Sequence, residues 1–268
     1  MLWSSYSKLL TLNNKDLKYT SNSFGNRLGS MLKVDLRRMF VSPMLYVCMG
    51  IAFAIPVLVL VMTSMVGDED GGLMFTNAWK IIASESGGMS MDMTSMMDIN
   101  LMYFMTGIFL CLFVSEDFRS GYVKNLFTVR ARKSDYVISK TVSGWIAGAL
   151  FLTAFFIGAV IGGGAAGLPF TLGAAGIFGL TMCMLSKIFL MGVFVAIFLL
   201  MSVIAKSKSW LSILLALFIG MMLFMMIPMM TPIDAGIMNL GLTMAGGVIF
   251  AAAIGCGSNL ILKKTSLV

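Results

Sequence analysis

The chain has 268 residues, of which 59% are hydrophobic and only 12% are charged, with a formal net charge of +7. Soluble domains carry roughly 25% charged residues, so this composition excludes an ordinary soluble domain and predicts an integral membrane protein. The chain contains no histidine, which excludes imidazole catalysis and histidine metal ligation. Its four cysteines are scattered without metal or redox spacing, and we interpret them as small buried apolar residues.

Residues 1–43 are expected to form a cytoplasmic N-terminal segment, and their first twenty residues are too polar for a cleavable signal peptide. Between residues 27 and 40 apolar side chains recur with helical spacing, so we predict an amphipathic elbow helix in the membrane interface. Its basic residues Lys33, Arg37 and Arg38 lie away from the apolar face. They are expected to point toward phospholipid headgroups or a partner.

Charge-free runs predict six membrane spans, because about 20 apolar residues cross the hydrocarbon of a bilayer. We place these spans at about 44–65, 97–115, 139–163, 184–205, 209–230 and 238–262, followed by a cytoplasmic tail at 263–268. Residues 141–186 carry no charge and are too many for one span, so the chain must turn near Gly167 and Pro169. Residues 170–205 then form either one span with an extracellular extension or two short spans separated at Lys187.

The distribution of Lys and Arg distinguishes six spans from seven, because these residues concentrate on the cytoplasmic side. With six spans and a cytoplasmic N-terminus, 17 of the 19 basic residues lie in the cytoplasm. Seven spans would instead expose Lys206, Lys208, Lys263 and Lys264 outside. The expected fold is therefore an all-α integral membrane protein with six transmembrane helices and both termini cytoplasmic.

Residues 115–140 form a cytoplasmic loop in this topology and carry nine charged side chains. A simple topological anchor that contacts lipid headgroups would account for the basic excess. The loop is also amphipathic, since Phe118, Tyr122, Leu126 and Val129 share one side of a helical wheel. Glu116 and Asp117 lie at its start, which favours a helix N-terminus there, whereas Gly121 weakens the helix. Such a helix with an apolar stripe is typical of a segment that docks into a groove on another protein.

Two segments together resemble the type-2 ABC transporter permeases, namely LRRMFVSPMLYV at the end of the elbow helix and EDFRSGYVKNLFTVRARKSDYVISK after the second span. The similarity is greatest to the six-span subunits of bacterial bacitracin- and lantibiotic-immunity exporters. That family has an acidic residue, a glycine, a Lys-Asn pair, an arginine and a Tyr-x-x-x-Lys motif after span two. The matching positions here are Asp117 or Glu116, Gly121, Lys124, Asn125, Arg130 or Arg132, Tyr136 and Lys140.

The resemblance implies that the loop is a coupling helix seated on a separate ABC ATPase present in two copies. The residues implied to couple are Glu116, Asp117, Phe118, Arg119, Gly121, Tyr122, Lys124, Asn125 and Arg130. No G-x-x-x-x-G-K-[ST] phosphate loop occurs in the chain, so ATP and Mg are expected on the partner, with no cofactor and no catalytic residue here. A second permease, identical or paralogous, and membrane lipid are the other expected partners, with no nucleic acid.

The resemblance further implies a bacterial plasma-membrane exporter of amphipathic or antimicrobial peptides. Met102, Met105, Met222 and Met226 are candidates for the pathway lining, because flexible thioethers adapt to varied apolar partners. Lys187 is the only charge expected within a span, which argues against an ion-coupled carrier.

Two further patterns leave alternatives open. The exterior loop contains Met89, Met91, Met93, Met96 and Met97, a spacing that would suit Cu(I) handling, although we assign no metal site. A non-transporting anchor or sensor that recruits a cytoplasmic partner is the other alternative. The glycines of span three, Gly144, Gly148, Gly158 and Gly162, share one sector and indicate either packing within the chain or a dimer seam.

Overall fold

The computed structural model describes residues 24–65, 77–83, 98–128, 132–172, 176–206, 208–224, 231–233 and 235–264. Every regular element in these ranges is a helix, which confirms the expected all-α class. The elements in chain order are α2 (Phe24–Val41), α3 (Pro43–Met65), the 3-10 helix η1 (Ala78–Ile81), α5 (Leu101–Arg119), α6 (Tyr122–Thr128), α7 (Lys133–Ala165), α8 (Gly176–Ala205), α9 (Ser209–Phe224) and α11 (Ile237–Lys264).

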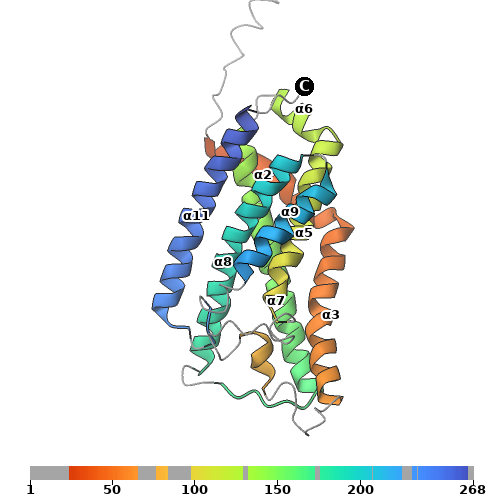
Figure 1. Cartoon of the computed structure of the whole chain (residues 1–268), viewed down its shortest axis with the longest axis vertical. Coiled ribbons are helices and arrows are strands. Elements are labelled where there is room, and N and C mark those ends of the chain that lie inside the picture. The colour runs from red at the N-terminus through yellow and green to blue at the C-terminus, as the bar shows by residue number, and fades with distance from the viewer. Residues whose placement is uncertain are drawn as a thin grey trace, which may run out of the picture.

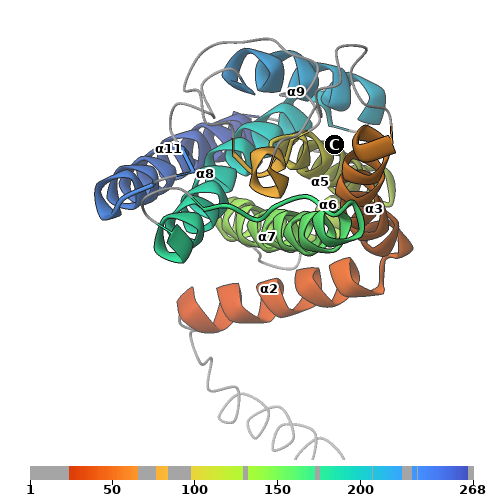
Figure 2. The ribbon, with the colours of Figure 1, turned by 90° about the horizontal axis from the view of Figure 1, so that it is seen from below.

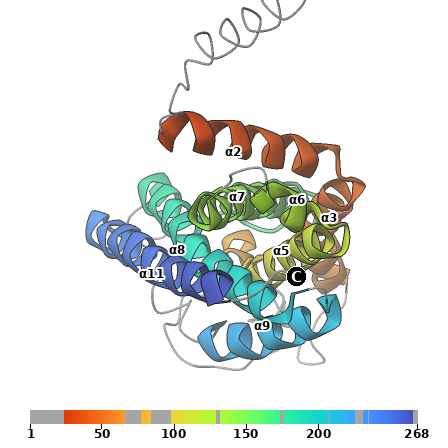
Figure 3. The same cartoon turned by 90° about the horizontal axis from the view of Figure 1, so that it is seen from above.

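The long helices run side by side along the long axis of the molecule, with α6 at one end and η1 at the other (Figure 1). We refer to these as the α6 end and the η1 end. Helix α2 lies across α7 at the α6 end (Figure 3), and α11 finishes at that same end (Figure 1). The first and last described helices therefore share one end of the bundle, as an even number of crossings requires.

Five of the described helices are long and apolar enough to cross a membrane, namely α3, α5, α7, α8 and α11. A sixth apolar helix, α9, has 16 residues and is shorter. Helix α8 is continuous over 30 residues, about 45 Å at 1.5 Å per residue. Residues 176–205 therefore form one helix rather than two short ones, and Lys187 lies inside it. The predicted turn follows α7, where Gly167 adopts a positive φ of 67°.

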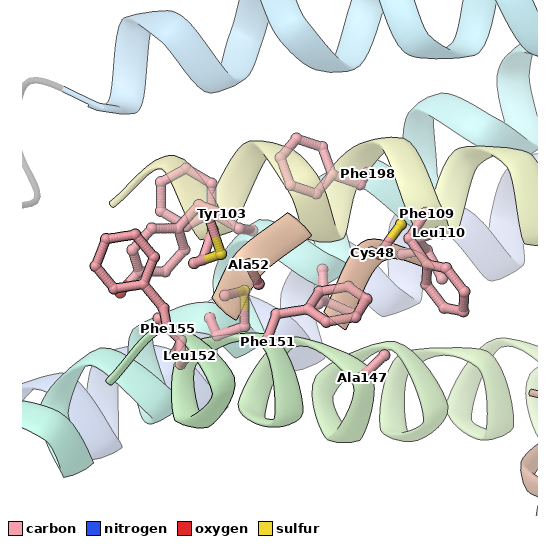
Figure 4. Packing of buried hydrophobic residues seen from close by; sticks show 14 of the residues in the cluster. Cys48, Ala52, Tyr103, Phe109, Leu110, Ala147, Phe151, Leu152, Phe155 and Phe198 are labelled. Carbon is pink, nitrogen blue, oxygen red and sulfur yellow. The ribbon is translucent and has the colours of Figure 1, made fainter. Parts of the chain in front are cut away.

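Aromatic and aliphatic side chains of α5, α7 and α8 form the centre of the bundle. Figure 4 shows Phe151, Leu152 and Phe155 of α7 facing residues of α5. Phe151 meets Phe109 edge to face with ring centroids 5.6 Å apart. Such contacts contribute about 0.5–1.5 kcal/mol beyond the burial of their area, and they hold the central helices in register.

Helices α3 and α11 lie at the edge of the bundle (Figure 2), and most residues of their apolar stretches are not buried. In the most apolar stretch of α11 only 11% of the residues are buried, compared with 61% in α8. Leu242, Val248 and Phe250 are each more than half exposed. A helix that is apolar all round and exposed requires lipid or another protein around it.

The glycines of α7 allow close approach to neighbouring helices of the same chain. Gly148 faces Met191 of α8, and Gly158 faces the backbone carbonyl of Phe53 in α3. At Gly162 an added Cβ would lie 2.8 Å from the Cα of Val57. Of the two interpretations of the glycine sector, packing within the chain is therefore the one observed.

We predict that Gly162→Ala destabilises the bundle by about 1–3 kcal/mol, because the new methyl meets backbone that cannot rotate away. Gly164→Ala is the matched control in the same helix, since a methyl added there would have nothing within 4 Å of it. Thermal unfolding of the purified full chain in detergent checks this. Equal melting temperatures for the two variants would contradict the close α3–α7 contact.

Candidate functional site

The chain reverses direction at the α6 end between α5 and α6. Helix α5 continues to Arg119, so Glu116 and Asp117 lie in its last turn. This corrects our expectation that the two acidic residues begin the loop helix. Gly121 makes the turn with a φ of 71°, in the left-handed region that glycine adopts without strain. The short helix α6 then begins at Tyr122, so the glycine that weakened the helix prediction is the point at which two helices separate.

Asp117 is fully buried and is the centre of an ionic cluster formed by Asp35, Arg38, Asp117 and Lys140. Arg38 Nη1 of α2 lies 2.7 Å from Asp117 Oδ1, and Lys140 Nζ of α7 lies 2.7 Å from Asp117 Oδ2. Lys140 Nζ also donates to Asp35 Oδ1 at 2.8 Å. The cluster therefore joins three helices, α2, α5 and α7, through one carboxylate at the end of α5.

The cluster contains two carboxylates and two cations, so its formal charges cancel. Asp35, Asp117 and Lys140 are each 0% exposed, and the Arg38 side chain is 32% exposed. Removing such charges from water costs several kcal/mol per ion unless paired charges and hydrogen bonds compensate. Aromatic rings add to this compensation, since Lys140 Nζ lies 4.0 Å from the ring centroid of Phe113 and Arg38 Cζ lies 4.4 Å from that of Tyr122.

Hydroxyl groups complete the hydrogen bonding of the two carboxylates. Tyr136 donates its hydroxyl to Asp117 Oδ2 at 3.2 Å, and Ser139 donates to Asp35 Oδ2 at 2.6 Å. Burial raises the pKa of Tyr122, and the charge of Asp35 raises it further, so this phenol stays neutral. A second ion pair, between Arg27 Nε and Asp135 Oδ2 at 3.4 Å, fixes the beginning of α2 to α7.

Helix α6 presents its polar face outward and its apolar face to its own bundle. Val123 is 1% exposed, and Leu126 and Phe127 pack against the main core. Of the stripe expected to dock into another protein, Phe118, Tyr122 and Leu126 are half-buried, and Phe118 and Leu126 pack against the core of this chain itself. Val129 lies outside the described residues. Lys124 and Asn125 are exposed. They form the outward surface of α6 together with Thr128, whose hydroxyl donates to the Asn125 carbonyl at 2.8 Å.

The described coupling residues predicted from the sequence thus divide into three groups by exposure. Glu116, Arg119, Lys124 and Asn125 are exposed, Phe118, Gly121 and Tyr122 are half-buried, and Asp117 is buried. Arg130 lies outside the described residues. Of the predicted elbow residues, Lys33 and Arg37 are exposed. Arg38 instead turns toward the bundle and binds Asp117, which corrects our expectation that it points away from it.

Sequence reasoning missed Asp35 and gave Lys140 only a place in the family pattern. A signal for Asp35 does exist, because an acidic residue three positions before Arg38 is out of place in a basic interfacial helix. The methionines do not gather at one surface. Met102 is 0% exposed, Met105 is half-buried and Met222 is 71% exposed. Met226 and the exterior methionines 89–97 lie outside the described residues.

A second polar group is buried toward the η1 end, around Lys187 of α8. Lys187 Nζ donates to Asn100 Oδ1 at 2.9 Å and to Thr231 Oγ1 at 3.0 Å. Asn100 in turn donates its backbone and side-chain N–H groups to Asp98, at 2.9 and 2.6 Å. Lys187 thereby fastens the start of α5 and the segment before α11 to α8.

Burial raises the pKa of Asp98 to about 7, against the opposing effects of the Lys187 charge and the bonds from Asn100. A carboxylate in this range titrates within the physiological window, unlike an exposed aspartate with a pKa near 4.

These features define a multi-pass, all-α membrane protein with a short polar helix projecting at one end. The model of the ABC-2 family of transporter proteins matches residues 36–223, well over half of the chain. The chain therefore belongs to the ABC-2 family and is the membrane permease component of an ABC transporter rather than its ATPase. Membership implies association with an ABC ATPase. No curated protein and no solved structure matches the chain.

We predict that Asp117→Asn lowers the free energy of unfolding by about 3 kcal/mol, because it leaves the buried Lys140 and the half-buried Arg38 facing a neutral amide. Glu116→Gln is the matched control, since this neighbouring carboxylate is exposed and its neutralisation should change stability by less than about 0.5 kcal/mol. Chemical denaturation of the full chain in detergent checks both values. Combining Asp117→Asn with Arg38→Gln should recover part of the loss, whereas an additive loss would contradict the pairing.

We predict that stability falls as pH rises from about 5 to 7. An unfolded aspartate ionises near pH 4, whereas folded Asp98 remains protonated until about pH 7. Between these values the folded state binds the extra proton, so the free energy of unfolding decreases by roughly 1–3 kcal/mol and then levels off. Melting temperatures between pH 5 and 8 should show this slope in the native chain and lose it in Asp98→Asn. An unchanged slope in the variant would assign it to another group.

Proposed function

We propose that the chain is the permease subunit of an ATP-driven exporter in the bacterial plasma membrane, with α6 as its coupling helix. The observation that carries this proposal is the division of α6 into two faces. Its apolar face packs on the bundle through Val123, Leu126 and Phe127, and its polar face is exposed around Lys124 and Asn125. The exposed face can receive force from an ATPase, and the packed face can pass it to the spans.

The charge distribution supports a cytoplasmic α6 end. The exposed basic residues Lys33, Arg37, Arg119, Lys124, Arg132, Lys206 and Lys208 all belong to segments at this end. Toward the η1 end the described basic residues are Lys80 and Lys187. An excess of Lys and Arg marks the cytoplasmic side of a membrane protein, which would place the described ends of the chain, at α2 and α11, there as well.

The ionic cluster supports a specific route for the motion. A partner that displaces α6 also displaces the end of α5 through the turn at Gly121. Asp117 then transmits the displacement to α2 through Arg38 and to α7 through Lys140. Because packed helices have discrete arrangements rather than continuous ones, such a displacement favours rigid-body movement between two states. The energy for it comes from the different affinity of the ATPase for each state.

The complete transporter, in this proposal, has two ATPase subunits that bind ATP and Mg and a second permease, identical or paralogous. The large exposed apolar faces of α3, α9 and α11 leave room for such a second permease beside membrane lipid. Amphipathic or antimicrobial peptides are the proposed substrates, as in the bacitracin- and lantibiotic-immunity exporters that the chain resembles. Lys187 is engaged by Asn100 and Thr231, which supports an ATP-driven rather than an ion-coupled mechanism.

We predict that Lys124→Glu uncouples ATP hydrolysis from transport without unfolding the protein, because it reverses the charge on the exposed face of α6. The expected loss is at least tenfold in peptide-stimulated ATP turnover, with the melting temperature unchanged. Lys206→Glu is the matched control, since it is an exposed basic residue at the same end on a segment away from α6. The measurement is ATPase activity of the reconstituted complex with and without peptide.

Isolation of the complex tests the proposal that the chain is a permease subunit coupled to an ABC ATPase. Affinity purification of the full chain from its native host should recover an ABC ATPase, and Lys124→Glu should reduce that recovery while Lys206→Glu should not. Recovery without any ATPase would favour an anchor or sensor instead. Stimulation by Cu(I) rather than peptide would replace the proposed substrate but keep the coupling role.

A further inference from the structure

A partly open cavity of about 230 Å³ lies at the α6 end, next to the ionic cluster and lined by no residue of α6. Its walls are the first turns of α3 and α9 and the last turns of α5, with Ser42, Ser115 and Ser209 among the lining residues. In Figure 3 α3 and α9 lie on either side of α5. None of the functions discussed above uses this cavity.

One buried polar atom in the cavity wall has no partner within the described part of the chain. Ser115 is 1% exposed, and its Oγ makes no hydrogen bond there. A buried hydroxyl left without a partner costs about 1–3 kcal/mol, so the group is expected to meet a ligand atom. The first turn of α9 adds backbone N–H groups at the positive end of a helix dipole, an arrangement that suits an anion such as a phosphate.

The charged residues of the cavity have both signs. Arg119 and Glu116 are exposed and both line it. Arg119 can add a charged donor to a phosphate, and Glu116 can accept from an ammonium group. A ligand that carries a phosphate and an ammonium close together satisfies both side chains, whereas a plain anion leaves Glu116 opposed to it.

The remaining walls and the surroundings place the cavity at the level of lipid headgroups. Met44, Phe109, Leu112 and Phe113 form an apolar lining. Tyr46 and Trp210, in the first turns of α3 and α9, are 58% and 66% exposed. Exposed Tyr and Trp at helix ends mark the membrane–water interface. The volume is below the roughly 300–1,000 Å³ of drug-sized sites, so it fits a headgroup better than an amphipathic peptide.

We propose that this cavity binds the headgroup of a phosphoethanolamine lipid, with the phosphate at Ser115, Ser209 and Arg119 and the amine at Glu116. The lipid glycerol and upper acyl chains would follow the apolar lining. Phe113 joins the site to the ionic cluster, because its ring also lies 4.0 Å from Lys140 Nζ. Lipid occupancy therefore stabilises the packing around Asp117. The proposal concerns lipid binding by the chain and does not depend on the ATPase.

The test uses the purified full chain, delipidated in mild detergent, with phosphatidylethanolamine titrated in and monitored by native mass spectrometry and thermal unfolding. We expect one retained lipid and a rise in melting temperature for the native chain. Ser115→Ala should bind roughly tenfold more weakly, the equivalent of one hydrogen bond of about 1.4 kcal/mol. Without lipid this variant should be as stable as the native chain, because it removes an unpartnered hydroxyl. Ser143→Ala is the control, since this buried serine already donates to the Ser139 carbonyl.

Comparing the binding of two lipids identifies the headgroup. Phosphatidylglycerol should bind more weakly than phosphatidylethanolamine, and Glu116→Gln should remove this difference. Equal retention of lipid by the native chain and Ser115→Ala would overturn the proposal. It would also be overturned if inorganic phosphate alone reproduced the stabilisation, which would make the site one for a free anion, or if a peptide displaced the lipid stoichiometrically, which would make it a substrate site.

Discussion

A carboxylate inside a membrane protein persists only where cations and hydrogen bonds replace the water it has lost. Asp117 meets this condition through Arg38, Lys140 and the hydroxyl of Tyr136. Because its partners come from α2 and α7, the end of α5 can occupy one position only. The direction of the turn at Gly121, and hence the placement of α6, follows from this interaction. An interfacial helix, two spans and a projecting helix are thus arranged by one buried charge.

Polar interactions are concentrated toward both ends of the bundle, while its centre is held by apolar packing. At the η1 end Lys187 joins the start of α5 to the segment before α11, and at the α6 end Lys140 joins α2 to α5 and α7. Between them the helices meet through aromatic rings and close glycine contacts. Ion pairs and hydrogen bonds at defined positions specify which helices are neighbours, whereas apolar contacts allow the helices to slide slightly past one another. This combination suits a helix bundle whose helices must move as rigid bodies and then return to the same register.

Hydropathy and turn-forming residues were sufficient to predict the helical class and the turn at Gly167, because both depend on local composition. Such local signals do not identify a side chain that binds a residue far away in the sequence. Asp117 and Arg38 read as surface charges in the sequence, yet each neutralises the other inside the fold. The predicted apolar stripe shares Leu126 with the face of α6 that packs inward, but the sequence could not distinguish a surface offered to another protein from one that packs on its own bundle. Asp35 was overlooked for the same reason, since its partners lie more than 100 residues away.

The small buried share of α11 has a consequence for how the protein is made. This helix contacts mainly α8, and at their closest point an added Cβ on Gly247 would lie 2.8 Å from the Phe189 carbonyl oxygen. With so little of its surface covered by the rest of the chain, α11 must partition into the bilayer on its own hydrophobicity rather than be drawn in by the bundle. The helices before α11 can therefore pack against one another before α11 docks on α8.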